Sequence, residues 1–174
     1  MTEVVIATLK AEFSDVSDPA QLTRIVARLL LAAVLGGALG YEREKSGKSA
    51  GLRTHMLVAI GAALFVLVPQ QGGMGAGDMS RVIQGIVTGV GFLGAGAIIK
   101  QHAEHNVQGL TTAAGVWMTA AIGIACGLGR EATAVVSTIL ALIVLTAVPH
   151  LFARGPAGVE NEPAGNGGDR IRRD

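Results

Sequence analysis

Five apolar stretches account for most of this chain, and each is close to the length that a helix needs to cross a membrane. They are Leu22–Gly40, Thr54–Pro69, Val82–Lys100, Leu110–Leu128 and Ala132–Phe152. The hydrocarbon core of a bilayer is ~30 Å thick and takes about 20 helical residues. Inside lipid, an uninterrupted apolar run satisfies its backbone hydrogen bonds as a helix. The sequence therefore predicts an all-α integral membrane bundle of about five glycine-rich transmembrane helices.

The polar segments divide the 174 residues into three regions. Residues 1–18 form a leader, in which Val4–Phe13 is either an interfacial helix along the membrane surface or a disordered stretch. Residues 19–152 hold the predicted helices and leave no room for a second folded domain. Residues 153–174 are rich in Gly, Pro, Asn and charge, which predicts disorder. Pro69 is expected to limit the second helix, and Gln70–Ser80 is expected to be an irregular glycine-rich loop.

Lysine and arginine are divided unequally between the two sides of the predicted bundle, and this imbalance sets the orientation of a membrane protein. The richer side holds Arg43, Lys45, Lys48, Arg53, Lys100, Arg154, Arg170, Arg172 and Arg173, and the other side holds Lys10, Arg24, Arg81 and Arg130. We expect the richer side to be cytoplasmic. The amino terminus then lies outside and the carboxy terminus lies in the cytoplasm.

Small residues recur four positions apart in the apolar stretches. Because small residues let helix backbones approach closely in lipid, such repeats indicate tight helix packing. The alternative is that some of these glycines line a narrow pathway or act as hinges. The glycines that we expect to pack helices are Gly36, Gly40, Gly85, Gly89, Gly94, Gly115 and Gly123.

Polar side chains near the membrane are the main pointers to function. Arg28 lies deep in the first helix and pairs either with the acids Asp78 or Glu131 or with lipid headgroups. Around the first loop, Glu42 reaches Arg53 if the loop folds back. Such a pair closes the inner end of the bundle or forms a binding site, whereas the alternative is a solvated basic loop that only sets topology.

Other polar residues lie in the third and fourth helices and in the loop between them. Gln84, Thr111 and Thr112 are placed to bond across helices, while Asn106 and the two threonines are equally placed to cap the fourth helix. His102, Glu104 and His105 form only a loose set of metal-ligand types, so we expect no metal. The candidate binding residues are Arg28, Glu42, Arg43, Arg53, Thr54, His55, Asp78, Gln84, Asn106, Thr111 and Thr112.

No pattern in the sequence indicates catalysis. There is no phosphate-binding loop, no nucleophile beside a base and no pair of acids within the predicted spans. Cys126 is the only cysteine, which rules out a disulfide within the chain. We therefore expect a protein that is not an enzyme and that has neither a cofactor nor a nucleic-acid partner.

Four consecutive segments resemble the signature blocks of the MgtC/SapB family of bacterial membrane proteins. They read GGALGYERE, AGLRTHMLVAIGAALF, GIVTGVGFLGAGAIIK and VQGLTTAAGVWMTAAIGIACGLG, and the resemblance runs from about Arg28 to Leu145. It implies a bacterial inner-membrane protein of about five helices, linked to survival under magnesium limitation or related envelope stress. Longer members of the family carry a folded cytoplasmic domain after the last helix, whereas this sequence has a short tail there.

The resemblance and the residues leave two interpretations of function. In the first, the protein is a non-catalytic regulator that binds other membrane proteins through its glycine-rich faces. The resemblance implies partners such as the F-type ATP synthase or transporters, and a homo-oligomer is also possible. In the second, it is a small channel or transporter, with Glu42, Arg53, Gln84 and the threonines along the path. A cation path usually carries acids at membrane depth, and the spans show none.

Overall fold

The computed structural model describes residues 1–12, 18–99 and 109–152 as six helices and no strand. They are α1 (Thr2–Glu12), α2 (Pro19–Lys45), α3 (Leu52–Gln71), α4 (Ala76–Ile99), α5 (Leu110–Gly127) and α6 (Glu131–Phe152). The five helices α2 to α6 are each long and apolar enough to cross a membrane. The predicted all-α membrane bundle of five spans is confirmed.

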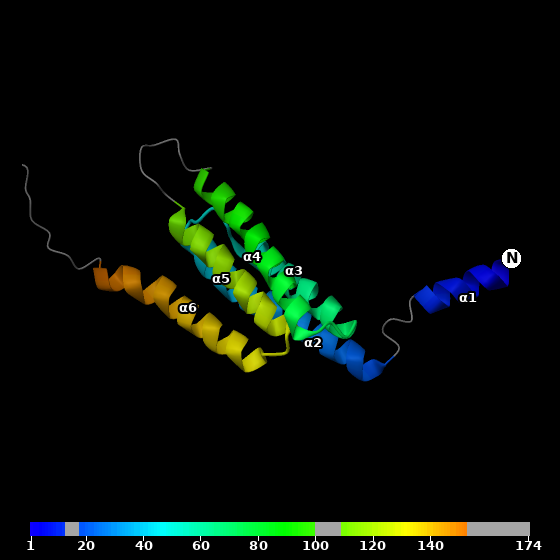
Figure 1. The fold of residues 1–174 in the computed structure, drawn as a ribbon. Helices are drawn as coiled ribbons and strands as arrows, with labels where there is room; N and C mark the ends of the chain where they lie inside the picture. Colours follow the sequence, from blue (N-terminus) through cyan, green and yellow to red (C-terminus); the bar gives the residue numbers. More distant parts are fainter. Residues whose placement is uncertain (13–17, 100–108, 153–174) are drawn as a thin grey trace, which may run out of the picture.

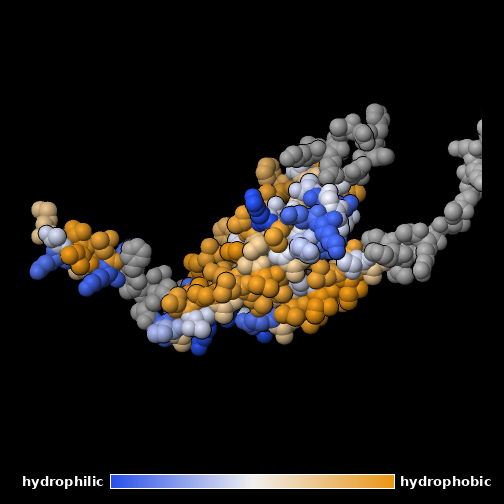
Figure 2. Space-filling view, turned by 180° about the vertical axis from the view of Figure 1, so that it is seen from behind, coloured by the Kyte–Doolittle hydropathy of each residue, from blue (hydrophilic) through white to orange (hydrophobic). Residues whose placement is uncertain are grey.

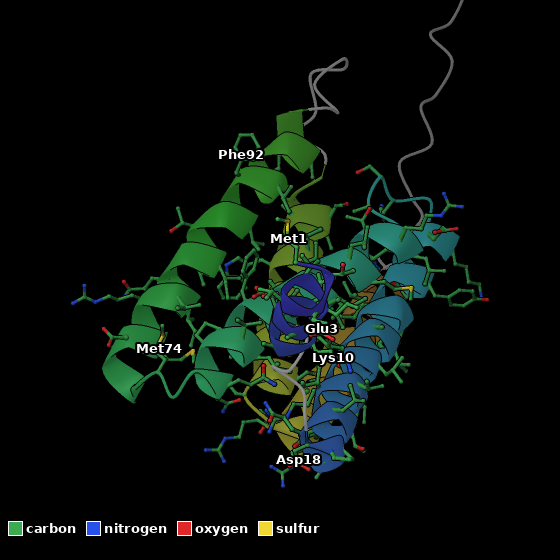
Figure 3. All side chains as sticks on the ribbon, turned by 90° about the vertical axis from the view of Figure 1, so that its right-hand side faces the viewer. Met1, Glu3, Lys10, Asp18, Met74 and Phe92 are labelled. Carbon is green, nitrogen blue, oxygen red and sulfur yellow. The ribbon has the colours of Figure 1, made fainter. Side chains whose placement is uncertain are left out.

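Helix α5 packs against all four of the other spans, and α3 packs against α2, α4 and α5; the five helices lie together in Figure 1. Helix α4 packs on α5 and α3, and α6 packs on α2 and α5. Helix α1 contacts none of the other described helices and has no buried residue. It stands apart from the bundle in Figure 1 and is seen end-on in Figure 3. The five spans therefore form one packed unit without α1.

Successive spans run in opposite directions, so the bundle has two ends. We call the end with the turn between Lys45 and Leu52 the α2–α3 end, and the end with the turn between Gly127 and Glu131 the α5–α6 end. Gly129 has φ +73° in the second turn, a conformation that favours glycine. This short turn holds α5 and α6 antiparallel and in contact.

The helix starts use two kinds of cap. Asp18 precedes α2, and its side chain accepts a hydrogen bond of 3.0 Å from the backbone N–H of Ala20. Gly51 precedes α3 and has no side chain to act as a cap. The Glu44 carboxylate supplies the missing acceptor from across the turn, at 2.8 Å from the Leu52 backbone nitrogen. This bond ties the end of α2 to the start of α3.

Two expected boundaries differ from the structure. Helix α3 continues past Pro69 to Gln71, because a proline in the last turn disrupts few bonds of the helix. Helix α4 begins at Ala76, inside the segment that we expected to be an irregular loop. Met79 in that first turn is 7% exposed and packs in the core, so its burial offsets the low helix propensity of the neighbouring glycines.

The surface of the bundle is largely apolar, as Figure 2 shows for one face. Exposed large apolar side chains occur on every span, for example Val34 on α2, Phe65 on α3 and Val136 on α6. Continuous apolar surface of this extent is unusual for a soluble monomer. Together with the five spans, it identifies a multi-pass membrane protein.

Candidate functional site

The backbone of α3 is approached very closely from two sides by glycines. A Cβ atom added at Gly36 of α2 lies 2.7 Å from the Cβ of Ala59, and one added at Gly40 lies 2.7 Å from the Cα of Leu52. On the opposite side, a Cβ added at Gly123 of α5 overlaps the carbonyl oxygen of Ala59. Three of the glycines that we expected to pack helices therefore lie directly against α3.

The other expected packing glycines differ among themselves. Gly94 and Gly115 are buried, and a Cβ added at either makes ordinary van der Waals contacts. Gly85 and Gly89 of α4 are exposed, and a Cβ added at either meets no atom within 4 Å. Among the described residues no other helix lies against these two glycines, so their role in helix packing stays a prediction.

The close approach of α2, α3 and α5 encloses a polar cluster near the α2–α3 end. His55 of α3 is 0% exposed, and Arg43 of α2 is 4% exposed. The Arg43 Nε donates to the Glu42 carboxylate, which also accepts a hydrogen bond of 2.9 Å from the Ser46 hydroxyl. The buried guanidinium therefore has its counter-charge on the adjacent residue of the same helix.

The structure does not form the expected pair between Glu42 and Arg53. Arg53 is exposed, and the carboxylate turns instead toward Arg43. The physical reason is burial: Arg43 is enclosed and needs a counter-charge, whereas water already solvates Arg53. Thr54, the next residue, is exposed as well. Of the candidate residues around this turn, Glu42, Arg43 and His55 lie in the polar cluster. Arg53 and Thr54 do not.

The imidazole of His55 has one partner and one free nitrogen. Nδ1 lies 3.0 Å from the carbonyl oxygen of Gly51, and because a carbonyl oxygen only accepts, Nδ1 carries the hydrogen. In the neutral imidazole, Nε2 is then a hydrogen-bond acceptor. It is buried and has no hydrogen-bond partner among the described residues. It lies 3.5 Å from the position of a Cβ at Gly115, so it faces the backbone of α5.

Arg28 forms a second polar cluster at the α5–α6 end. Its Nη1 donates to the Gln70 side-chain oxygen at 2.9 Å and to the Gly127 carbonyl oxygen at 3.1 Å, and its Nε lies 3.7 Å from the Glu131 carboxylate. Arg28 of α2 thus joins α3, α5 and α6. The sequence analysis proposed Glu131 as a partner of Arg28 but did not propose Gln70. The position of Gln70, a polar residue at the end of the second apolar stretch, could have indicated it.

Asp78, the other proposed partner of Arg28, lies elsewhere. Its carboxylate is 4.0 Å from the Nε of Arg81, one turn later on α4, and both side chains are largely exposed. An exposed pair of this kind contributes only about 0–1 kcal/mol to stability. Asp78 therefore takes no part in the cluster around Arg28.

We expect the substitution Arg28→Met to destabilise the bundle by about 1.5–3 kcal/mol, since it removes hydrogen bonds from a charged donor that joins four helices. Arg24→Met is the matched control, because Arg24 lies one turn earlier on α2 and is exposed. Thermal melting of both variants in detergent checks this. Equal melting temperatures for the two variants would show that the Arg28 contacts do not hold the helices together.

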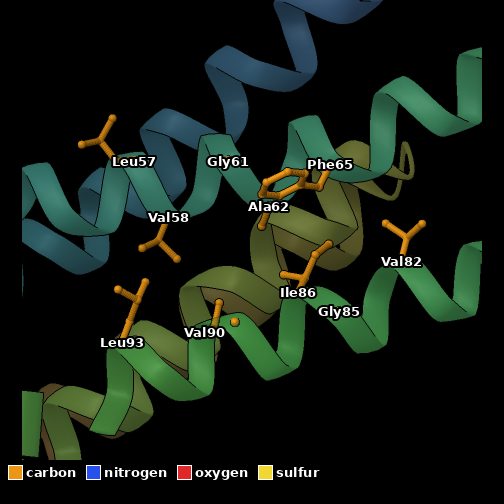
Figure 4. A pocket seen from close by; sticks show the side chains of 11 residues that line it. Leu57, Val58, Gly61, Ala62, Phe65, Val82, Gly85, Ile86, Val90 and Leu93 are labelled. Atoms are coloured by element: carbon orange, nitrogen blue, oxygen red, sulfur yellow. The ribbon is translucent and has the colours of Figure 1, made fainter. Parts of the chain in front are cut away.

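An apolar groove of about 660 Å³ lies between α3 and α4 (Figure 4). Its lining includes Leu57, Gly61 and Phe65 from α3 and Gly85, Gly89 and Leu93 from α4. We call it the α3–α4 groove. It is open to the outside of the bundle and carries no charged residue among those that line it.

The remaining candidate residues lie apart from one another. Gln84 is exposed on α4, and its side chain forms no hydrogen bond to another helix among the described residues. Thr111 is exposed, and Thr112 is buried at 1% exposure. Asn106 and the loose metal-ligand set of His102, Glu104 and His105 lie outside the described residues. Within the described ranges, no three His, Cys, Asp or Glu side chains gather as a metal site would require.

Comparisons with known proteins give consistent matches. A family model described as the MgtC family matches residues 29–154. Protein SrpB of Synechococcus elongatus is 42% identical over 138 residues, which cover 71% of this chain and 74% of SrpB. Protein MgtC of Brucella abortus is 46% identical over 125 residues, which cover 71% of this chain and 50% of that protein.

The protein named "Putative magnesium transporter YhiD" of Escherichia coli K12 is 43% identical over 139 residues, which cover 74% of this chain and 62% of YhiD. This chain thus spans less than two thirds of YhiD and half of the Brucella protein. No solved structure matches it.

Proposed function

Because this chain belongs to the MgtC family, we propose that it is a non-catalytic protein of the bacterial inner membrane that regulates other membrane proteins when magnesium is limiting. The name of YhiD associates that relative with magnesium transport, which supports the magnesium-related part of the proposal. The distribution of lysine and arginine supports an amino terminus outside and a carboxy terminus in the cytoplasm.

The observation that carries the regulatory role is the exposed face of α4. Gln84, Gly85, Thr88 and Gly89 are all exposed there, within a span of 24 residues. We call these four residues the α4 face. In membranes, small and polar residues are enriched where helices pack against helices. A surface of this composition is suited to another transmembrane helix rather than to lipid tails.

Gln84 gives this argument its polar part. It lies eight residues after the first residue of α4, which is about 12 Å along the helix. Its side-chain amide has no hydrogen-bond partner among the described residues, whereas the Thr88 hydroxyl donates to the Gln84 backbone carbonyl at 2.9 Å. An amide facing hydrocarbon without a partner is unfavourable. A helix that presents an amide or a hydroxyl to Gln84 removes that cost.

The α3–α4 groove adjoins the α4 face, since both contain Gly85 and Gly89. Phe92 is 82% exposed and projects from α4 (Figure 3). The proposed partner helix lies along this surface and takes the place of lipid. Partners that the family resemblance implies, such as the F-type ATP synthase or a transporter, remain proposals, as does a second copy of this chain.

A direct transport role is the second candidate, and the name of YhiD is the observation that favours it. Reconstitution of the purified chain in liposomes that contain a magnesium-sensitive dye separates the two. Magnesium entry above that of protein-free liposomes would contradict a purely regulatory role. Entry equal to that of protein-free liposomes supports it.

We expect the substitution Gly89→Leu to abolish function while leaving the protein folded. Among the described residues, no neighbouring atom lies within 4 Å of a Cβ added at Gly89, so we expect the new side chain to disturb mainly a partner that packs there. The measurement is growth of a deletion strain in limiting magnesium, complemented with each variant, together with the amount of membrane-inserted protein. We expect at least a tenfold loss of complementation at normal protein amounts.

Ala27→Leu is the matched control, because Ala27 is an exposed small residue on α2, away from the α4 face. It should complement like the parent. Full complementation by Gly89→Leu would contradict the proposal that a partner helix packs on the α4 face. Equal losses from both variants would indicate a general sensitivity of the protein to enlarged surface residues, and would also count against it.

A further inference from the structure

One stripe of α4 is exposed over most of the length of the helix. Its residues follow one another at alternating spacings of three and four, which places them on one side of the helix. They are Asp78, Arg81, Gly85, Thr88, Phe92 and Ala95, and each is exposed in the part of the chain that the structure describes. We call them the α4 stripe. Helices that run side by side in a membrane pack along a seam of this spacing.

A large aromatic side chain stands among small residues on this stripe. Phe92 is 82% exposed and projects from α4 (Figure 3). Thr88 and Ala95 lie about one turn to either side of it, Gly91 lies beside it, and all three are exposed. Where two parallel helices pack along a seam of this spacing, a side chain of one inserts between four residues of the other at the same depth. Two parallel copies of α4 therefore place each Phe92 ring over the small residues of the other copy.

Gln84 lies directly beside the stripe, and its amide carries two N–H donors. The Thr88 hydroxyl donates its hydrogen to the Gln84 backbone carbonyl at 2.9 Å, which leaves the lone pairs of the hydroxyl oxygen able to accept. Between two parallel copies, Gln84 of each lies at the depth of Gly85 and Thr88 of the other. Each amide then has the Thr88 hydroxyl of the other copy as an acceptor, so one pairing satisfies both amides.

The stripe begins with one charge of each sign. Asp78 and Arg81 lie in the first two turns of α4, where their side chains are 71% and 83% exposed. A stripe with charges of one sign would repel its own copy. Here Asp78 of one copy attracts Arg81 of the other, because the two residues lie at nearly the same depth. Two copies are therefore complementary in charge where α4 enters the membrane.

These three features select the occupant of the stripe. It must offer, at three successive depths, charges of both signs, an acceptor for an amide and a hollow of small residues for an aromatic ring. A second copy of α4 offers all three, because copies of one membrane protein share their orientation and depth. A two-fold axis along the membrane normal brings the same surface of both copies together.

We propose that two copies of this chain pair through the α4 stripe, with their α4 helices parallel and side by side about such an axis. The pairing rests on the proposed function, since it names the partner of the α4 face. Another membrane protein that uses this face must displace the second copy, so the dimer is the resting form of the regulator.

Disulfide cross-linking of the full chain in native membranes tests the pairing, in a Cys126→Ala background because Cys126 is the only cysteine. Thr88→Cys places a thiol in the middle of the stripe, and we expect copper phenanthroline to convert most of this variant to a covalent dimer. Val34→Cys is the matched control, because Val34 is 66% exposed on α2 at a similar depth. It should give at least tenfold less dimer. Equal amounts of dimer would overturn the pairing, because they would reflect random collisions.

Adding Phe92→Ala to the Thr88→Cys variant should lower its cross-linking at least tenfold, because the change removes the ring that fills the hollow of the second copy. Leu93→Ala is the matched control, since Leu93 is the next residue, is 49% exposed and lies off the stripe. It should leave the amount of dimer unchanged. Equal losses from the two changes would overturn the α4 stripe as the seam.

A photoreactive amino acid in place of Thr88 separates this inference from the proposed function. Cross-links to a second copy support the pairing. Cross-links to a different membrane protein, with none to a second copy, would overturn the pairing and leave the proposed function standing. The absence of a cross-link to any protein would overturn both, because lipid would then occupy the α4 face.

Discussion

Replacing Gly123 with alanine should remove most of the folded protein, although the change adds only one methyl group. The added Cβ overlaps the Ala59 carbonyl oxygen and lies 3.0 Å from the Ala59 Cα, so it collides with the backbone of α3. A backbone cannot rotate aside as a side chain does. Overpacking typically costs about 1–3 kcal/mol, and we expect Gly123→Ala to reach or exceed the upper value. Gly123→Leu should not accumulate.

The matched control is Gly89→Ala, which places the same methyl group where no other described part of the chain comes within 4 Å. It should accumulate and melt in detergent like the parent. Gly127→Ala should resemble Gly123→Ala. The Cβ added at Gly127 would lie 2.5 Å from the carbonyl oxygen of Ala63, which is one turn after Ala59 on α3. If Gly123→Leu accumulates and melts like the parent, α5 does not pack on α3 as the structure shows.

These glycines show what the sequence could and could not predict. The five spans can be predicted from the sequence because the length of an apolar segment decides whether it can cross lipid. Gly85–Gly89 and Gly36–Gly40 have the same four-residue spacing, yet within the part of the chain that the structure describes only the second pair lies against another helix. The spacing identifies a small face but not its occupant, because that depends on how each helix is rotated in the bundle.

The polar pairs were harder to predict than the helices. Side chains at adjacent positions of a helix normally do not face each other, so the sequence favoured Arg53 across the turn over Arg43 as the partner of Glu42. The structure has Arg43 as the partner instead, because Arg43 is buried, with its Cδ 4.0 Å from the position of a Cβ at Gly115 of α5. The sequence also could not predict that the His55 Nε2 lacks a hydrogen-bond partner among the described residues. That follows from the approach of Gly115, which lies on a helix about 60 residues away.

The substitution Glu42→Gln should be among the most destabilising changes at the α2–α3 end. Arg43 is 4% exposed, and its ion-pair partner among the described residues is Glu42. Removing one member of a buried pair leaves an uncompensated charge and typically costs about 3–5 kcal/mol. Arg53→Gln should change stability by less than about 0.5 kcal/mol, because that side chain is exposed.

The double variant Glu42→Gln, Arg43→Met separates a charge effect from a general effect of altered packing. It removes both charges, so it should be less harmful than the sum of the two single changes. Melting of the parent, Glu42→Gln, Arg43→Met and the double variant in the same detergent measures this coupling. Additive losses would show that the two side chains act independently. Equal losses from Glu42→Gln and Arg53→Gln would instead favour a pair across the turn, because only that arrangement makes both residues necessary to the same contact.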